Sequence, residues 1–265
     1  MKKSMNEFGF ETGLTYRQKF EMLSNAGFDA IEFNLSEAMS DKTLGEVNDL
    51  SKEYGIEVAG FVANDLWTHH LTSPDTSERE KAKELVRMLV RHAEAARCDS
   101  VLVVPGVVNE DVSYLSAWNN ASKAIGELLP FIEEHKVNVC IENVWNKFLT
   151  SPFDMARFVD SFDSEYVASY FDAGNVLINA YPEHWIEILG KRIKRLHIKD
   201  FRRAVGNLDG FVGLMDGDMN WTSLTAALRK IGYDGFMTVE VPPYRGANEI
   251  YLKTVSAMLD LILSK

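Results

Sequence analysis

The heptapeptide VNVCIEN at residues 137–143 is a short apolar run that ends on the carboxylate of Glu142. An apolar run of this length, bounded by polar residues, is typical of a parallel strand that is covered on both faces. The stretch therefore predicts a buried strand that delivers Glu142 to the edge of a sheet. A single glutamate at a strand end is more often a solvated loop residue or a helix-capping partner. The interpretation therefore depends on whether the pattern recurs.

Predicted strands and helices alternate along the whole chain on both sides of this stretch. The expected strands cover residues 3–6, 28–34, 56–62, 100–104, 137–143, 166–172, 193–197 and 235–241. The expected helices cover residues 16–26, 41–54, 74–97, 114–135, 152–162, 182–189, 221–231 and 248–263. Eight such units without a flexible linker predict a closed (β/α)8 TIM barrel, as a single α/β domain over residues 1–265. An open doubly wound sheet is the alternative, although no GxGxxG motif follows any strand.

Local signals mark several of the helix ends. Ser73-Pro74 and Ser151-Pro152 each combine an N-cap serine with a proline suited to the first helical position, so both pairs predict helix starts. The turns AGFD at 26–29 and IGYD at 231–234 are near copies of each other. This similarity is expected if one helix-to-strand unit is reused around a ring.

With 46% hydrophobic and 25% charged residues, the composition is that of a soluble globular protein. No apolar segment approaches the ~20 residues that a membrane span requires, and the N-terminus lacks an apolar signal core. We therefore expect a cytoplasmic protein without a membrane partner. The net charge of -11 argues against nucleic acid as a partner. Cys98 and Cys140 lie in apolar contexts without CxxC spacing, so both are expected to be reduced core residues.

Charged side chains end the last four predicted strands. These residues are Glu142, Asp172, His197 and Glu240, separated by the intervals of successive strand-helix units. Because the C-terminal ends of barrel strands converge on one face, the four side chains should meet. Three carboxylates in a partly dry cleft repel one another, and a cation resolves that repulsion. Three oxygen ligands and one imidazole suit Mn²⁺, Mg²⁺, Co²⁺ or Zn²⁺ without choosing among them.

Each of these residues also has a structural explanation when taken alone. Asp172 could shape a turn in the Asp-Ala-Gly-Asn segment. His197 could bond to its neighbour Asp200, and Glu240 could pair with Arg245. Their coincidence at four strand ends favours a metal site over these separate roles.

Side-chain alternation indicates which residues face the interior of the barrel. If Glu142 points inward, Cys140 does so too, while Ile141 faces the helices. In the last strand, Val239 is expected to face outward. In strand seven the same rule places Arg195 inside the barrel, which is unexpected for a cation.

Five segments of the chain carry a resemblance to known proteins: CIEN at 140–143, FDAGN at 171–175, LHIKD at 196–200, residues 213–221, and GYDG at 232–235 with Glu240. On these segments the chain resembles the sugar phosphate isomerase/epimerase family of xylose-isomerase-like TIM barrels. That group includes ketose 3-epimerases and L-ribulose-5-phosphate 3-epimerases. The resemblance extends over nearly the whole chain.

The resemblance implies that Glu142, Asp172, His197 and Glu240 hold one divalent metal ion, with Mn²⁺ as the first choice. It also implies that Glu142 and Glu240 are the acid/base pair of a sugar or sugar-phosphate isomerase/epimerase. Proton abstraction next to a ketose carbonyl gives an enediolate, whose charge a metal ion stabilises. Return of the proton from the opposite face gives epimerisation, and transfer to the adjacent carbon on the same face gives isomerisation.

Two positions depart from the ketose 3-epimerases that act on free sugars. Asn175 stands where those enzymes have a substrate-binding histidine, and Phe148 stands where they have a glutamate. Arg203 matches their arginine six residues beyond the strand-seven histidine. The substrate-binding candidates are Asn143, Trp145, Asn175, Arg203 and His70, and the candidates for orienting His197 are Lys199 and Asp200.

Other functions of the same scaffold remain open at this point. A metal-dependent dehydratase of a keto-inositol or related sugar-derived substrate would share the metal and the proton abstraction but expel water. An abasic-site endonuclease needs more histidines than the 6 present and a basic surface. A non-catalytic sugar-binding protein is the fourth reading. The sequence leaves open whether the small-molecule substrate is phosphorylated and whether the chain forms a homo-oligomer.

Overall fold

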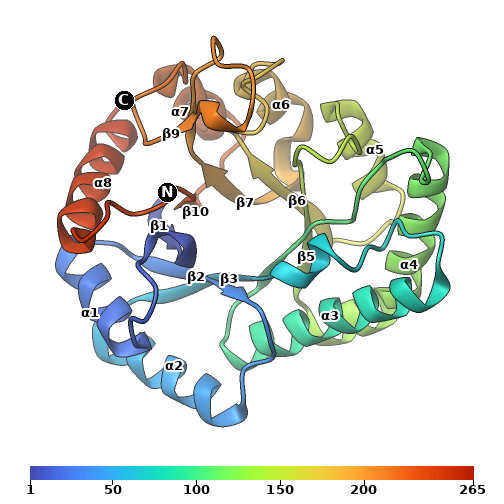
Figure 1. Cartoon of the computed structure of the whole chain (residues 1–265), viewed down its shortest axis with the longest axis horizontal. Coiled ribbons are helices and arrows are strands. Elements are labelled where there is room, and N and C mark those ends of the chain that lie inside the picture. Colours follow the sequence, from blue (N-terminus) through green and yellow to red (C-terminus); the bar gives the residue numbers. More distant parts are fainter.

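The computed structural model describes residues 1–265 and forms a closed barrel of eight parallel strands (Figure 1). In chain order the barrel strands are β1 (Lys2–Asn6), β2 (Ala30–Leu35), β3 (Glu57–Ala63), β4 (Ser100–Val103), β5 (Asn138–Glu142), β6 (Val167–Asp172), β7 (Ile193–Ile198) and β10 (Phe236–Val239). Each strand pairs with the next, and β1 pairs with both β2 and β10 to close the ring. The predicted TIM barrel is therefore confirmed, and the open sheet is excluded.

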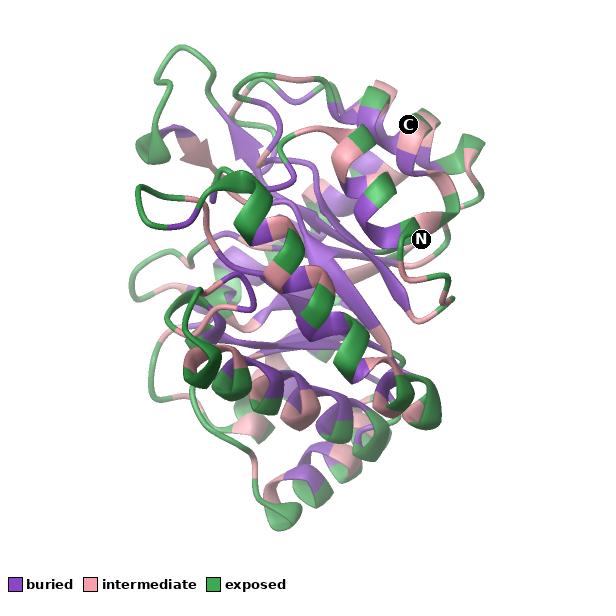
Figure 2. Ribbon diagram, turned by 90° about the vertical axis from the view of Figure 1, so that its right-hand side faces the viewer, coloured by how far each residue is buried: buried purple, intermediate pink, exposed green.

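Eight helices surround the barrel, as the alternating pattern predicted. They are α1 (Tyr16–Ala26), α2 (Asp41–Tyr54), α3 (Thr76–Ala95), α4 (Tyr114–His135), α5 (Pro152–Asp160), α6 (Pro182–Leu189), α7 (Trp221–Lys230) and α8 (Asn248–Leu263). A short hairpin of β8 (Asp200–Phe201) and β9 (Phe211–Val212) follows β7 and was not predicted. Figure 2 shows buried residues along the strands and on the inner faces of the helices.

One of the two predicted Ser-Pro helix starts is correct and the other is wrong. Ser151 caps α5, where its hydroxyl accepts a hydrogen bond of 3.1 Å from the amide of Asp154. Helix α3 instead begins at Thr76 with Asp75 as its cap. The hydroxyl of Ser73 accepts from the amide of Asp75 and so stabilises a turn before the helix. Because Asp75, two residues after Ser73, is the N-cap, α3 begins later than predicted.

The predicted alternation of side chains holds in the strands. Cys140 packs inside the barrel with Leu102 and Tyr170, whereas Ile141 and Val239 belong to the larger cluster between the strands and the helices. Both cysteines are free and buried, as expected.

Arg195 does lie inside the barrel, and the structure supplies the partners that the sequence did not reveal. Its Nε donates to the carbonyl of Ala59 at 2.7 Å, and its guanidinium also bonds to the carboxylate of Asp99. The guanidinium carbon lies 5.1 Å from the ring centroid of Phe236. These partners belong to the N-terminal ends of the strands, so Arg195 fills the barrel floor below the strand ends that carry Glu142 and His197.

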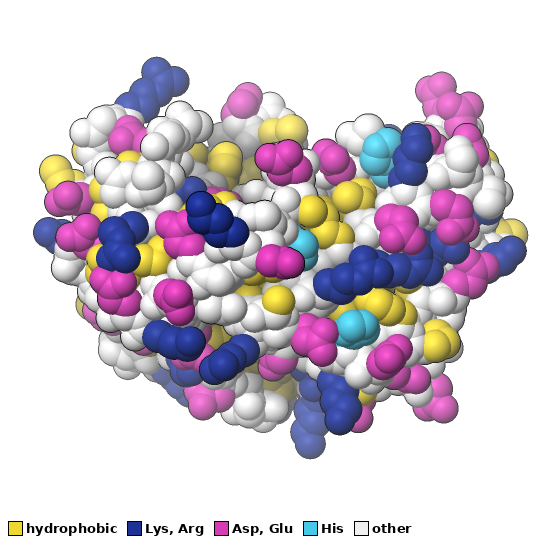
Figure 3. Space-filling view, turned by 90° about the horizontal axis from the view of Figure 1, so that it is seen from below, with side chains coloured by type: hydrophobic (Ala, Val, Ile, Leu, Met, Phe, Trp, Pro, Cys, Tyr) yellow, Lys and Arg dark blue, Asp and Glu magenta, His cyan; other side chains and the backbone are white.

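The outer surface is mixed in charge. On the face shown in Figure 3, Lys and Arg side chains are interleaved with Asp and Glu side chains. Along α3, ion pairs such as Lys81 with Glu78 and Arg87 with Glu84 place opposite charges three residues apart. None of the helices has the length and apolar character needed to cross a membrane.

Candidate active site

Four side chains predicted from separate strands meet at the C-terminal end of the barrel. Glu142 and Asp172 are the last residues of β5 and β6, His197 is the penultimate residue of β7, and Glu240 directly follows β10. One ligand atom from each of the four lies within 4.8 Å of the others. Glu142, Asp172 and His197 are buried, and Glu240 is partly exposed.

The imidazole of His197 lies between two glutamates. Its Nδ1 is 2.9 Å from Oε1 of Glu142 and 3.9 Å from Oε2 of Glu240. Its Nε2 is 2.6 Å from Oε1 of Glu32 on the opposite side. His197 does not bond to Asp200, whose carboxylate instead accepts from the amides of Phe201 and Met219.

Glu32 is a site residue that the sequence analysis missed. It lies in the middle of β2, and its side chain is completely buried. Besides His197, it accepts hydrogen bonds from the amide group of Asn6 at 2.6 Å and from the hydroxyl of Tyr170. A side chain at Gly60 would crowd it, because a Cβ there would lie 3.1 Å from Oε2 of Glu32. The available signal was a carboxylate in the apolar strand predicted at 28–34.

Lys199 balances part of the negative charge at this site. Its ammonium group donates to both Asp172 and Glu240. Gly174 permits this approach, because a Cβ there would lie 2.4 Å from Cγ of Lys199. Lys199 therefore contacts two of the clustered carboxylates directly, whereas the hydrogen bonds of His197 go to Glu142 and Glu32.

Burial and neighbouring charges shift the pKa values of these carboxyl groups in different directions. Burial raises the pKa of Glu142 to about 7, although the hydrogen bond to His197 acts in the opposite direction. For Glu240, burial also favours the protonated form, but the nearby charges of Lys199 and His197 outweigh it and lower the pKa. The two glutamates at the barrel mouth thus have different proton affinities.

A cavity of about 580 Å³ opens directly above the cluster. Glu142, His197, Lys199 and Glu240 lie at its polar end. Its remaining wall is largely apolar and consists of Phe8, Val62, Trp67, Leu102, Val104, Val144, Trp145, Leu208, Phe211 and Pro242, with Asn34, Asn64 and Asn175 among them. A cavity with apolar walls and a few convergent polar groups is the usual form of a small-molecule site.

Among the other substrate-binding candidates, Trp145 and Asn175 line this cavity. The indole nitrogen of Trp145 donates to the carbonyl of Asn175 at 2.7 Å, so the two residues hold each other in place. Asn143 lies behind the cavity, where its side chain exchanges two hydrogen bonds with the backbone of Asp172. Asp172 also accepts from the amide of Asn175, so its expected turn-forming role coexists with its place in the cluster.

Two further candidates, Arg203 and His70, also lie outside the cavity wall. Arg203 is exposed, and its guanidinium carbon lies 4.9 Å from the ring centroid of Tyr181. Its guanidinium also donates to the carbonyl of Ala180. The Nδ1 atom of His70 bonds to the carbonyl of Leu66. Phe148 is also absent from the wall, because it packs in an aromatic cluster with Trp118.

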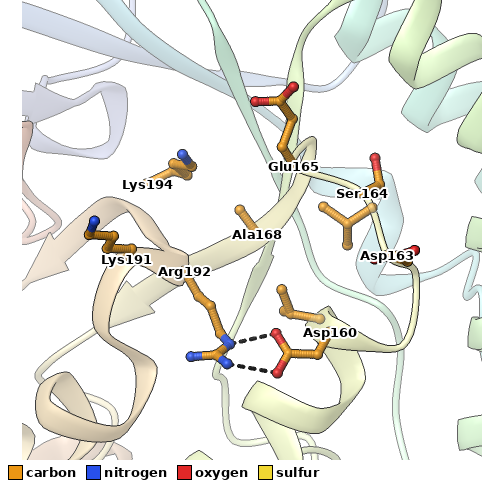
Figure 4. Close-up of a pocket in the computed structure, with 10 residues that line it drawn as sticks. Asp160, Asp163, Ser164, Glu165, Ala168, Lys191, Arg192 and Lys194 are labelled. Carbon is orange, nitrogen blue, oxygen red and sulfur yellow. Dashed lines mark hydrogen bonds and ion pairs between the residues drawn. The ribbon is translucent and has the colours of Figure 1, made fainter.

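Another cavity, of about 590 Å³, lies at the opposite end of β6 and β7. It is lined by charged side chains, and Figure 4 shows those of Glu165, Lys191 and Lys194 pointing apart. Arg192 is fully engaged there with Asp160 through contacts of 2.6 and 2.7 Å. None of the clustered carboxylates or histidines lies near it.

The donor set of the cluster fits a divalent metal ion. Three carboxylates and the Nδ1 atom of an imidazole converge from four neighbouring strands, and such a mixed set suits Mn²⁺, Co²⁺ or Zn²⁺ as well as Mg²⁺. The carboxylate of Glu32 on the other ring nitrogen adds the partner that metal-binding histidines generally have.

Residues 20–261 match the family model described as "Xylose isomerase-like TIM barrel". The chain belongs to this family. This assignment agrees with the resemblance expected from the sequence motifs.

Named relatives and solved structures agree with this membership. An uncharacterized protein of Methanocaldococcus jannaschii is 24% identical over 86% of this chain and 79% of its own length. The 3-oxo-isoapionate decarboxylase of Pectobacterium atrosepticum is 25% identical over 86% and 72%. The structure of a D-tagatose 3-epimerase-like protein has a TM-score of 0.83 at 22% identity, covering 100% of this chain and 99% of the other. That of 3-keto-D-glucoside 4-epimerase from E. coli has a TM-score of 0.82 at 13% identity, covering 100% of both.

Proposed function

We propose that this protein is a divalent-metal-dependent sugar isomerase or epimerase that moves a proton next to a ketose carbonyl. The observation that carries the proposal is the meeting of Glu142, Asp172, His197 and Glu240 under one cavity. The sugar epimerases among the structures of similar fold support it.

The four clustered residues would hold the metal ion, which when bound stabilises the negative charge that develops on the substrate oxygens. Glu142 and Glu240 each have a second carboxylate oxygen and can accept a proton. Strands β6 and β7 separate β5 from β10 in the ring, so the two carboxylates approach the cavity from different sides.

This arrangement suits removal of a proton by one glutamate and its return by the other. Return to the opposite face of the planar enediolate inverts the carbon and gives an epimer. If one glutamate instead moves the proton to the adjacent carbon on the same face, the product is an aldose/ketose isomer. The apolar side chains around Trp145 would limit the contact of water with the intermediate.

The proposal is tested by hydrogen exchange in D₂O. The protein is loaded with Mn²⁺ and incubated with a panel of ketoses and ketose phosphates, and deuterium is followed by NMR at the carbon next to the carbonyl. We expect exchange in the wild type and a loss of about 100-fold or more in Glu142→Gln and Glu240→Gln. Glu165→Gln, at the opposite end of the barrel, is the matched control and should exchange normally.

Several outcomes would contradict this assignment. Absence of exchange with every sugar, or undiminished exchange in both active-site variants, would refute it. Loss of water to an unsaturated product would indicate a dehydratase on the same site. Release of CO₂ from a 3-oxo acid would indicate the activity named for the Pectobacterium relative.

A further inference from the structure

The cavity above the cluster, here called the catalytic cavity, has a neighbour with which it shares two wall residues. This outer cavity has a volume of about 550 Å³, and Phe8 and Asn34 line both spaces. Pro242 lines the catalytic cavity and the adjacent Pro243 lines the outer one. The two cavities therefore lie side by side, with Phe8 and Asn34 at their boundary.

Neither cavity offers a free cation to an anionic substrate. Lys199, in the catalytic cavity, is engaged by Asp172 and Glu240. Lys19, in the outer cavity, is paired with Glu7 at 2.6 Å. Phosphate carries about two negative charges, and binding it without a free Lys or Arg would be unfavourable.

The walls suit both the apolar faces and the hydroxyl groups of a sugar ring. Phe8, Trp67 and Leu208 are 52%, 49% and 68% exposed, and they contribute apolar surface to the opening of the catalytic cavity. Large apolar side chains left exposed around a cavity generally mark a binding surface. Asn34 and Thr12 add groups that can exchange hydrogen bonds with hydroxyls.

From this geometry we propose that the substrate is an uncharged sugar of two rings. The sugar unit that carries the carbonyl, as a ring ketone or as an open-chain ketose, occupies the catalytic cavity, and a second sugar ring, joined by a glycosidic bond, occupies the outer cavity against Phe8. This inference rests on the proposed function. The glycosidic bond stays intact, and the only bond broken and re-formed is the C–H bond next to the carbonyl, whose proton passes to a carboxylate.

The test compares one-ring and two-ring probes in the D₂O exchange assay. D-Fructose and its 6-phosphate are compared with the disaccharides in which glucose is joined to O4, O5 or O6 of fructose. Methyl 3-keto-α-D-glucopyranoside is compared with the 3-keto derivative of trehalose. We expect at least one two-ring probe to exceed its one-ring counterpart by tenfold or more in kcat/KM.

Phe8→Ala tests the position of the second ring. We expect this variant to raise KM for the preferred two-ring probe at least fivefold more than it raises KM for the one-ring probe. Phe153→Ala is the matched control, because Phe153 is 63% exposed and lines neither cavity. It should behave as the wild type.

Failure of the two-ring inference can be distinguished from failure of the proposed function. Exchange that is equal for one-ring and two-ring probes, a preference for the 6-phosphate, or equal behaviour of Phe8→Ala and Phe153→Ala would overturn the two-ring inference alone. Absence of exchange with every probe would overturn the proposed function as well.

Discussion

At the scale of single residues, the contact between Glu32 and His197 has a direct consequence for metal binding. The carboxylate of Glu32 accepts a hydrogen bond from Nε2 and so keeps the proton on that nitrogen, while Nδ1 faces Glu142 and Glu240. A metal ion at the cluster would replace the proton that Nδ1 shares with Glu142. Tyr170 and Asn6 fix the orientation of Glu32 from β6 and β1. His197, the proposed metal ligand, is thus positioned by residues from three other strands.

We predict that Glu32→Gln weakens Mn²⁺ binding by about 10- to 100-fold. The amide keeps the size of the carboxylate but loses its charge, so the ring is held less firmly and is a weaker ligand. Isothermal titration calorimetry measures the affinity independently of any substrate. Glu165→Gln is the control, and an affinity in Glu32→Gln equal to that of the control would contradict the role of Glu32.

The sequence predicted the four clustered residues because a strand end is visible as a polar residue after an apolar run. Glu32 was not predicted because it lies inside a strand and not at its end. Only the barrel geometry shows that it reaches His197. Arg203 was selected because it matches, six residues beyond His197, an arginine of the ketose 3-epimerases that the chain resembles. That distance does not determine where a loop side chain points, and the structure places it over Tyr181.

At the scale of secondary-structure elements, His92 links two neighbouring helices. It lies in α3, and its Nε2 accepts a hydrogen bond of 2.8 Å from the amide of Met39, directly before the Ser40 cap of α2. Burial lowers the pKa of His92 below its ordinary value of 6.5. The contact therefore requires the neutral imidazole.

We predict that this link weakens in mild acid. Because the pKa of His92 is lower in the folded than in the unfolded protein, its stabilisation is complete above about pH 6.5 and declines as the pH falls through the folded-state pKa. His92→Gln can accept the same hydrogen bond without titrating. Thermal unfolding at pH 7.5 and 5.5 should show a larger loss of Tm in the wild type, and parallel losses would refute the prediction.

The start of a helix was predicted correctly where only one capping residue was present. Ser151 is the N-cap of α5, as predicted. The N-cap of α3 is Asp75, two residues after the predicted Ser73. The β8–β9 hairpin was missed because strands of two residues leave no periodic pattern. Arg195 was placed inside the barrel by alternation alone, but its partners Asp99 and Ala59 come from distant strands and required the closed ring.

At the scale of the whole molecule, metal binding should stabilise the folded barrel, because the four ligands converge only in the native state. A metal concentration 100 times the Kd contributes about 2.7 kcal/mol of stability, which corresponds to an increase in Tm of roughly 5 to 10 °C for a chain of this size. Differential scanning calorimetry with Mn²⁺ and with chelator measures this shift. An unchanged Tm under saturating Mn²⁺ would argue against binding at the cluster.

The position of Lys199 between Asp172 and Glu240 bears on whether the barrel can fold before it binds a metal ion. An internal ammonium group that satisfies both carboxylates allows the barrel to fold before any metal ion arrives. The site is then complete when it first meets the metals of its surroundings, and divalent ions compete for it by both affinity and abundance. Under the proposed function, we therefore expect a purified sample to carry whichever ion its source supplied, and the working metal would be identified by removing that ion and adding each candidate back.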